Sequence, residues 1–163
     1  MTNNQSISER AKPVVRVLDQ FARRADVAAA LAQAQAEARA RLLGEPGLAE
    51  FSVALDLTQL VSAVPDTVGS IRVAVYRGAG GSSEERHPNS TQYLMVLDAP
   101  VETHVELAHG WHIDRYGHGA GTTLEDRWHV VEPGTWHKTI GANGGMWSIV
   151  AFHSAPDVAD EYR

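Results

Sequence analysis

Two short segments in the second half of the chain carry side chains that commonly bind metal ions, each just ahead of an apolar stretch. The first segment contains Glu85, His87 and Gln92. If residues 85–87 are extended, Glu85 and His87 point to the same side, because alternate residues of a strand share a face. The Pro-Asn-Ser turn at residues 88–90 then allows Gln92 to return to the same interior. We expect these three polar groups to converge.

The second segment, EPGTWH at residues 132–137, contains a Pro-Gly turn that places His137 at the start of a new strand. His137 can therefore join the first group. The 163 residues include no cysteine, which excludes disulfides, thiolate nucleophiles and Cys-based metal sites from this chain. Any metal ion must then be bound by nitrogen and oxygen ligands.

The two segments resemble the two sequence motifs of the cupin superfamily. In that family the first motif runs roughly His-x-His-x4-Glu before an apolar strand, and the second has a Pro-Gly turn followed by His. The resemblance covers about residues 70–153 and implies that His87 and His137 bind a divalent metal ion. Glu85 stands where the family has its first His, and Gln92 stands where it has Glu. The resemblance also implies a homodimer.

The ligand set that this resemblance implies combines two imidazoles with one carboxylate, from His87, His137 and Glu85. Such a set holds Fe(II) on one face and leaves open positions for oxygen and substrate, which favours a non-heme Fe(II) oxygenase. Gln92 would be a weak neutral oxygen ligand, or would hydrogen-bond a bound water or substrate. We assign catalytic roles to Glu85 and Gln92 and expect one divalent metal ion per chain, with Fe(II) ahead of Mn, Ni and Zn.

Two other classes of protein fit the same residues. One is a metal-dependent lyase or isomerase without redox chemistry, in which the metal acts as a Lewis acid. The other is a ligand-binding or sensing barrel without turnover, whose altered first motif has lost the metal. A buried carboxylate beside two histidines is costly without a metal, because an isolated buried charge loses much of its solvation energy. This cost favours the metal-binding alternatives.

Three further residues are candidates for binding a small polar substrate. Arg72 and Tyr76 share one face of the strand expected at residues 71–76, and Arg72 would bind a substrate carboxylate through its planar guanidinium. An exposed position is the alternative for both. Trp136 directly precedes His137, so its position fixes how that ligand enters the barrel. The other histidines are expected mostly at the surface, with the barrel mouth as the alternative for the last of them, and none is assigned as a ligand: His104, His109, His112, His118, His129 and His153.

The composition changes near Gly44, from an Ala-rich part without glycine to a part rich in β-branched, aromatic and glycine residues. Apolar residues at helical spacing predict a helix over residues 13–24, and Asp26 is expected to cap a second helix that ends before Gly44. We therefore expect a flexible segment at residues 1–12 and a helical arm at residues 13–43.

From residue 48 to residue 156 the chain shows short alternating segments, separated by turns that contain glycine or proline. This pattern is typical of an antiparallel sandwich or barrel and not of alternating βαβ units. Together with the motif resemblance, it predicts an all-β fold: a single cupin barrel (double-stranded β-helix or jelly roll) with an N-terminal helical extension. The expected strands lie at residues 51–58, 71–76, 92–97, 101–107, 111–116, 128–131, 137–140 and 146–153.

Charge and hydropathy narrow the choice of partners. The formal charge of −6 leaves no surplus of Lys and Arg for neutralising phosphates, so nucleic acid is not an expected partner. The N-terminal sequence lacks the pattern of a signal peptide, and no window has the roughly 18 apolar residues of a membrane helix. We expect a cytoplasmic protein that acts on a small molecule, away from membranes. The helices at residues 13–43 are expected to pack over one end of the barrel or against a second subunit, in preference to binding another partner, and are candidate contacts of a homodimer.

Overall fold

The structure is a computed structural model that describes residues 7–117 and 123–163. Its helices are α1 (Lys12–Ala22) and α2 (Ala25–Gly44), close to the expected ranges. The expected cap of the second helix is wrong. Arg24 occupies the N-cap position without a side-chain bond, and Asp26 lies in the first turn. The Asp26 carboxylate instead accepts hydrogen bonds from the backbone N–H and hydroxyl of Ser62, at 2.7 and 2.6 Å, and so ties α2 to a distant loop.

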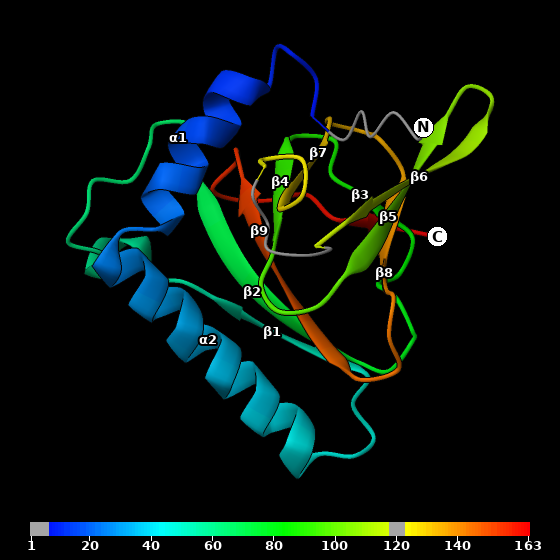
Figure 1. The fold of residues 1–163 in the computed structure, drawn as a ribbon, viewed down its shortest axis with the longest axis horizontal. Coiled ribbons are helices and arrows are strands. Elements are labelled where there is room, and N and C mark those ends of the chain that lie inside the picture. Colours follow the sequence, from blue (N-terminus) through cyan, green and yellow to red (C-terminus); the bar gives the residue numbers. More distant parts are fainter. Residues whose placement is uncertain (1–6, 118–122) are drawn as a thin grey trace.

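The strands of the described residues form two five-stranded sheets in which every pairing is antiparallel (Figure 1). The first sheet has the order β1 (Glu50–Ala54), β2 (Ser70–Arg77), β9 (Met146–His153), β4 (Gln92–Val96) and β7 (Trp128–Val131). The second sheet has the order β10 (Glu161–Tyr162), β3 (Glu85–Arg86), β8 (His137–Gly141), β5 (Val101–Leu107) and β6 (Gly110–Tyr116).

Most strands begin and end within two residues of the ranges that the sequence predicts. The first one does not, because β1 ends at Ala54 and a 3₁₀ helix, η1, follows at Leu57–Gln59. The Asp56 carboxylate accepts the backbone N–H of Thr58 at 3.0 Å and so favours a turn over an extended chain. The short strands β3 and β10 are absent from the sequence prediction. Through β10, the second sheet extends beyond residue 156, where the predicted barrel segment ended.

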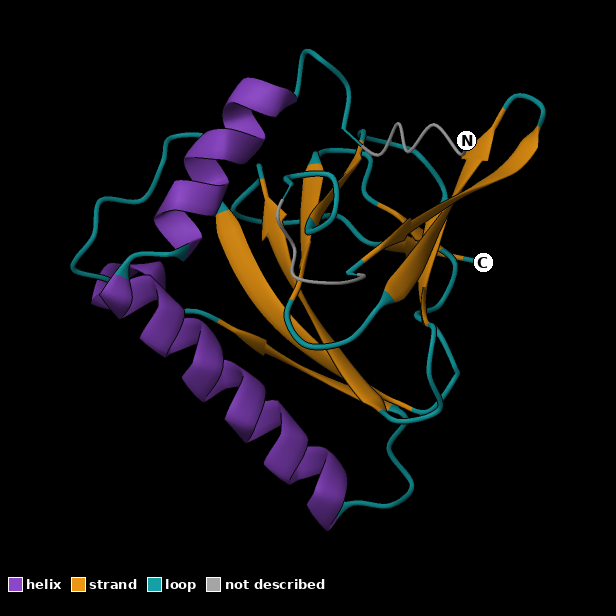
Figure 2. Cartoon of the chain, viewed as in Figure 1, coloured by secondary structure: helices purple, strands orange, loops and turns teal. Residues whose placement is uncertain are grey.

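Both helices cover the outer face of the first sheet (Figure 2). Val15, Leu18 and Val27 are fully buried there, in one apolar cluster with strand residues such as Val73 and Phe152. Burying a side chain of this kind stabilises the fold by about 1.5–3 kcal/mol. The helices are therefore part of the core and not a detachable arm.

The N-terminal segment contradicts part of the prediction that residues 1–12 are flexible. Ile7 and Ala11 are 5% and 8% exposed and belong to the same apolar cluster as the helices. Residues 1–6 of that prediction lie outside the described part of the chain. Neither described helix has the length and apolar character needed to cross a membrane.

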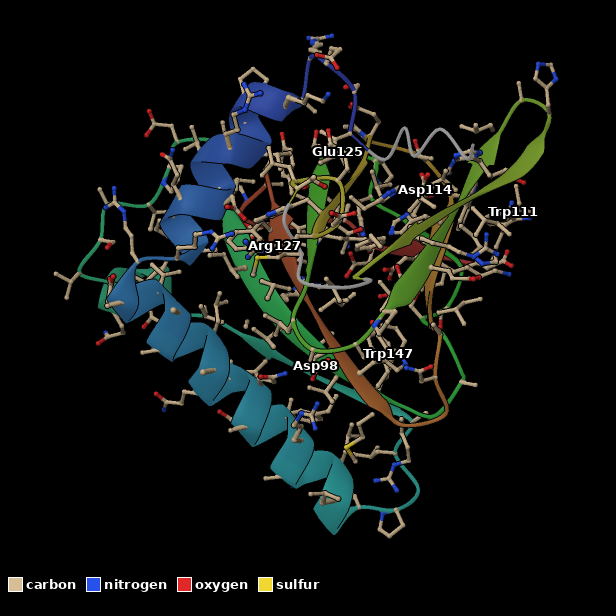
Figure 3. All side chains as sticks on the ribbon, in the orientation of Figure 1. Asp98, Trp111, Asp114, Glu125, Arg127 and Trp147 are labelled. Atoms are coloured by element: carbon tan, nitrogen blue, oxygen red, sulfur yellow. The ribbon has the colours of Figure 1, made fainter. Side chains whose placement is uncertain are left out.

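The loop after β4 ties α2 to the first sheet through Asp98, which Figure 3 shows beside this helix. The Asp98 carboxylate accepts the backbone N–H and hydroxyl of Ser148 at 2.9 and 2.8 Å. It also accepts Gln35 Nε2 at 2.8 Å and pairs with Arg39. Because Ser148 is fully buried on β9, this network fixes the helix against a central strand.

The inner faces of the two sheets enclose a cavity of about 310 Å³. Alternation along β2 sends Ile71, Val73 and Val75 outward to the helices, where they are fully buried. The same alternation sends Arg72 and Tyr76 inward, so both line the cavity. The polar side chains of the candidate motifs line it too.

Candidate metal centre

Three side chains from the second sheet and its flanking residues bring their ligand atoms together at the cavity. Glu85 lies on β3 and is paired in register with His137, the first residue of β8, while His87 directly follows β3. Glu85 Oε1 lies 3.6 Å from His137 Nε2 and 3.8 Å from His87 Nε2. All three ligand atoms lie within 4.8 Å of one another. Two atoms bound to one ion at about 2.1 Å are separated by at most about 4.2 Å, so the two contacts to Glu85 fit a shared metal.

Each imidazole is held by its other nitrogen. His87 Nδ1 lies 2.9 Å from Asp160 Oδ1, and His137 Nδ1 lies 3.0 Å from the carbonyl oxygen of Thr135. A carboxylate and a carbonyl can only accept, so each Nδ1 carries the proton and each Nε2 presents a lone pair. Both Nε2 atoms are buried and have no partner among the described residues. Leaving them unpaired is costly, and a divalent metal ion would satisfy both.

Burial lowers the pKa of His87, while the nearby Glu85 carboxylate opposes that shift and His137 adds to it. The His87 imidazole is therefore neutral near pH 7. A neutral imidazole is the form that binds metals, because the protonated ring has no free lone pair. The charge state of His87 thus suits the same chemistry as its geometry.

Gln92 and His153 form a second polar pair in the same cavity. The two residues are partners in the register of β4 and β9, and they are 4% and 1% exposed. Gln92 Oε1 and His153 Nδ1 are both buried without a partner among the described residues. The His153 ring meets His87 edge-on, with ring centroids 4.9 Å apart. Burial, reinforced by His87, lowers the pKa of His153 to about 3, so its ring is neutral.

The expected surface position of His153 is therefore wrong. Its alternation with Ile149 and Ala151, which also line the cavity, was the sequence signal that could have placed it inside. The Glu85, His87 and His137 cluster does not include His153. A ligand role for Gln92 stays a prediction.

Arg72 and Tyr76 both line the cavity, whereas Trp136 does not. Arg72 Nη1 pairs with Asp160 Oδ2 at 3.2 Å. The Tyr76 ring stacks on Trp147, with ring centroids 4.1 Å apart. Burial, followed by the carboxylates of nearby glutamates, raises the pKa of Tyr76, so its hydroxyl stays protonated. These two residues thus offer the cavity one paired cation and one hydroxyl.

Trp136 belongs to the outer surface of the second sheet. The guanidinium groups of Arg86 and Arg163 lie 4.8 and 4.6 Å from the centroid of its ring. Arg86 also pairs with Glu161 at 2.5 Å, as expected for a surface charge. Trp136 can affect His137 only as its neighbour in the chain.

The C-terminal segment supplies two cavity groups that sequence reasoning missed. Asp160 holds both His87 and Arg72, and Tyr162 lines the cavity. The segment is brought there by the antiparallel pairing of β10 with β3. Residues 87 and 160 are far apart in the chain, and no local motif around Asp160 marks it as a partner of a ligand.

A further buried polar cluster lies where β6 and β7 meet. His129 is 2% exposed, and neither of its ring nitrogens has a hydrogen-bond partner among the described residues. Its Nδ1 lies 3.5 Å from Asp114 Oδ2, and its ring stacks on Tyr116. Burial lowers the pKa of His129 to about 3 and raises the pKa of Asp114. The expectation that His129 is exposed is wrong, while His118 lies outside the described residues.

Comparison with known proteins shows the fold and leaves the activity open. No protein-family model matches the chain, and no curated protein matches it. Solved structures do match, and their sequence identities are low. Peruvianin-I, a cysteine peptidase from Thevetia peruviana latex, has a TM-score of 0.55 and 12% identity over 72% of this chain and 68% of its own length.

Two other similar structures are oxalate-metabolising enzymes. The oxalate decarboxylase of Lactobacillus farciminis, in a formate complex, has a TM-score of 0.55 and 13% identity over 70% of this chain. Oxalate oxidase in complex with glycolate has a TM-score of 0.52 and 13% identity over the same share. The chain spans 31% of the decarboxylase and 55% of the oxidase. It therefore has the all-β cupin fold with an N-terminal helical extension, as the sequence predicts.

Proposed function

We propose that this chain is a metal-dependent enzyme, a non-heme Fe(II) oxygenase acting on a small polar organic molecule. The observation that carries the proposal is the pair of buried Nε2 atoms of His87 and His137, which lack partners among the described residues and face the Glu85 carboxylate. Two imidazoles and one carboxylate on one face leave positions open for substrate and oxygen. A cysteine peptidase activity, as described for Peruvianin-I, has no support because these 163 residues contain no cysteine.

The protein's own residues would orient the reacting groups. A bound divalent metal supplies a Lewis-acidic centre and, in the case of iron, a redox-active one. Asp160 and Thr135 fix the two imidazoles. Gln92 Oε1 offers an acceptor to a hydroxyl or amino group of the substrate, and the neutral His153 ring forms a wall without adding charge.

A non-redox lyase or isomerase is the second candidate. The support is that the solved structures similar to this chain include both an oxidase and a decarboxylase, so this fold is compatible with either kind of reaction. The site residues do not separate them, because the same three ligands hold metals that act as Lewis acids. A binding or sensing role without turnover is the third candidate.

Oxygen uptake distinguishes the candidates. The chain would be loaded anaerobically with Fe(II) and exposed to air-saturated buffer with a panel of hydroxy acids, amino acids and polyols. We expect oxygen uptake in step with product formation, lost in His87→Ala and retained in His109→Ala, a change on the exposed end of a hairpin. Product without oxygen uptake would support a lyase or isomerase, and binding without product would support a sensor.

The homodimer and the cytoplasmic location remain proposals. Apolar side chains exposed on the hairpin of β5 and β6 could contribute to a dimer contact, with Leu107 53%, Trp111 38% and Ile113 40% exposed. Figure 3 shows Trp111 on this hairpin. Light scattering on the eluting peak of a size-exclusion column would give twice the mass of one chain if the dimer forms. Deletion of residues 1–43 is not a suitable test because these residues hold core side chains.

A further inference from the structure

The cavity wall carries few charged side chains, and these differ in whether another group of the protein already engages them. Among the described residues, the charged side chains that line the cavity are Glu50, Arg72 and Glu85. Glu85 belongs to the metal cluster, and the Arg72 guanidinium is neutralised by Asp160 at 3.2 Å. No ion pair or hydrogen bond within the described part of the chain engages the Glu50 carboxylate. Glu50 is therefore the charge on this wall that is left for a ligand.

On the wall formed by β1 and β2, the negative Glu50 and the positive Arg72 lie far from each other. Glu50 is paired in register with Tyr76, and Ala54 is paired with Arg72. Glu50 and Arg72 thus lie four residue steps apart along β1 and β2, or about 13 Å at about 3.3 Å per residue. The Arg72 end adjoins β9 near His153, and the Glu50 end adjoins Tyr76. A small ligand held near Glu50 is therefore too short to reach Arg72 as well, so Glu50 is the charged group of this wall that it meets.

The electrostatic surroundings of Glu50 favour a cation. Burial is the main cause that raises the pKa of Glu50, and the negative charge of Glu85 adds to it. Only the second cause reports on the field, and it shows that Glu85 makes the surroundings of the Glu50 carboxylate more negative. The protonated hydroxyl of Tyr76 shares this environment. A second carboxylate placed there would be repelled, whereas an ammonium group would relieve the repulsion.

The uncharged groups of the cavity also call for hydrogen-bond donors on the ligand. Gln92 Oε1 is a buried acceptor without a partner among the described residues, and a ligand N–H or O–H would satisfy it. A dicarboxylate has no donor for it and meets only one cation, which Asp160 already occupies. Such a ligand fits this wall poorly.

We propose that the substrate is a small zwitterionic amino acid, whose carboxylate faces the metal centre and whose ammonium group binds Glu50. This inference rests on the proposed function, because it needs a metal at Glu85, His87 and His137. It names the chemical class of the substrate and makes Glu50 the residue that selects for it. Specificity of this kind arises because a hydrogen-bonding site rejects analogues that leave its polar group unpaired.

Matched pairs of probes test the proposal without requiring turnover. The chain would be loaded with Co(II), whose visible spectrum reports changes in its ligands, and titrated at pH 7. The probes are glycine, β-alanine and γ-aminobutyrate, each against its hydroxy analogue: glycolate, 3-hydroxypropanoate and 4-hydroxybutanoate. Each pair differs only in an ammonium group in place of a hydroxyl, so the ratio of the two dissociation constants isolates the contribution of Glu50.

We expect at least one amino acid to bind about tenfold more tightly than its analogue. This is the lower end for a hydrogen bond to a charged group, because Glu50 lines the cavity but is exposed to solvent, which screens its charge. In Glu50→Gln the ratio should fall to about one, while Co(II) binds as in the wild type. Glu37→Gln, the same change on an exposed residue outside the cavity, should keep the ratio.

The possible outcomes distinguish a failure of the metal site from a failure of the proposed substrate class. A chain that binds no Co(II) contradicts the proposed function, and the substrate class fails with it. A chain that binds Co(II) but favours the hydroxy acids, or responds to none of the probes, overturns the substrate class alone. A preference for the amino acid that survives in Glu50→Gln overturns the role of Glu50.

Discussion

Asp160 should control metal affinity although it is not a metal ligand. Its Oδ1 accepts the proton of His87 Nδ1 at 2.9 Å, which fixes the tautomer and aims Nε2 into the cavity. Asp160→Ala removes this acceptor and frees the ring to rotate. Asp160→Asn keeps an acceptor oxygen and removes the charge. The two variants therefore separate orientation from charge.

Partners of this kind are typically worth about 10–100-fold in metal affinity, or about 1.4–2.8 kcal/mol. We expect the full range for Asp160→Ala and about 3–10-fold for Asp160→Asn, since a neutral hydrogen bond is worth about half a charged one. The assay is a competition of the metal-free protein with a chromophoric chelator for Zn²⁺ at pH 7. Urea unfolding of the metal-free variants would check that they fold.

The matched control is Asp157→Asn, an exposed aspartate three residues away in the same segment. It should bind Zn²⁺ as the wild type does. If Asp160→Ala also binds like the wild type, while folded, then Asp160 does not orient His87 and the reasoning is refuted. If Asp157→Asn weakens binding equally, a general loosening of the segment explains the loss instead.

Three further predictions concern the stability of the metal-free protein in urea unfolding. Asp98→Ala leaves the buried N–H of Ser148 without an acceptor and its hydroxyl with Gln35 alone, and should cost about 2–4 kcal/mol. Trp128→Phe loses the 2.8 Å bond from Nε1 to Asp19 and leaves a small void, for about 1–3 kcal/mol. The pKa of His129 is about 3 in the folded protein and about 6.5 in the unfolded chain. Between these values only the unfolded chain gains a proton as the pH falls. The free energy of unfolding therefore decreases by about 1.4 kcal/mol per pH unit below pH 6.5. His129→Leu should lessen this slope by that amount between pH 6 and pH 5.

Each of these predictions has an outcome that contradicts it. For Asp98, the comparison is Asp66→Ala, a change on an exposed loop, and equal stability of the two variants would show that the network is not stabilising. An unchanged stability in Trp128→Phe would mean that the indole bond contributes nothing. The same pH slope in His129→Leu and the wild type would show that His129 is protonated in the folded protein.

The sequence indicates which side chains form the Glu85, His87 and His137 cluster, because short local patterns mark each of them. Glu85 and His87 are two residues apart, and His137 follows a Pro-Gly turn, so each can be placed from its own segment. The helices and most strands are likewise predicted by the spacing of their apolar residues. This spacing can be recognised within each segment, without knowing which other segment packs against it. The helices and most strands therefore depend little on contacts between distant segments, whereas the cluster is completed by the pairing of Glu85 with His137 from a distant strand.

The missed residues depend on pairing between distant segments. His153 ends β9, whose side chains are buried on both faces from Trp147 onward. A strand of this kind appears in the sequence as a nearly continuous apolar run, so the alternation of His153 with Ile149 and Ala151 was only a weak signal. His129 is buried because β7 faces β6. The two sequence motifs, around His87 and around His137, do not predict this contact between strands. Asp160 reaches His87 only through the two-residue pairing of β10 with β3. Short strands of this kind have too little pattern to be recognised in a sequence.

We propose that Glu85, His87 and His137 together hold a divalent metal ion. The most direct test is elemental analysis of the purified protein, beside His137→Ala and His109→Ala prepared in the same way. We predict close to one transition-metal ion per chain in the wild type and in His109→Ala, and almost none in His137→Ala. Absence of metal from all three, even after incubation with Fe(II), Mn(II) and Zn(II), would contradict the claim and leave a metal-free barrel.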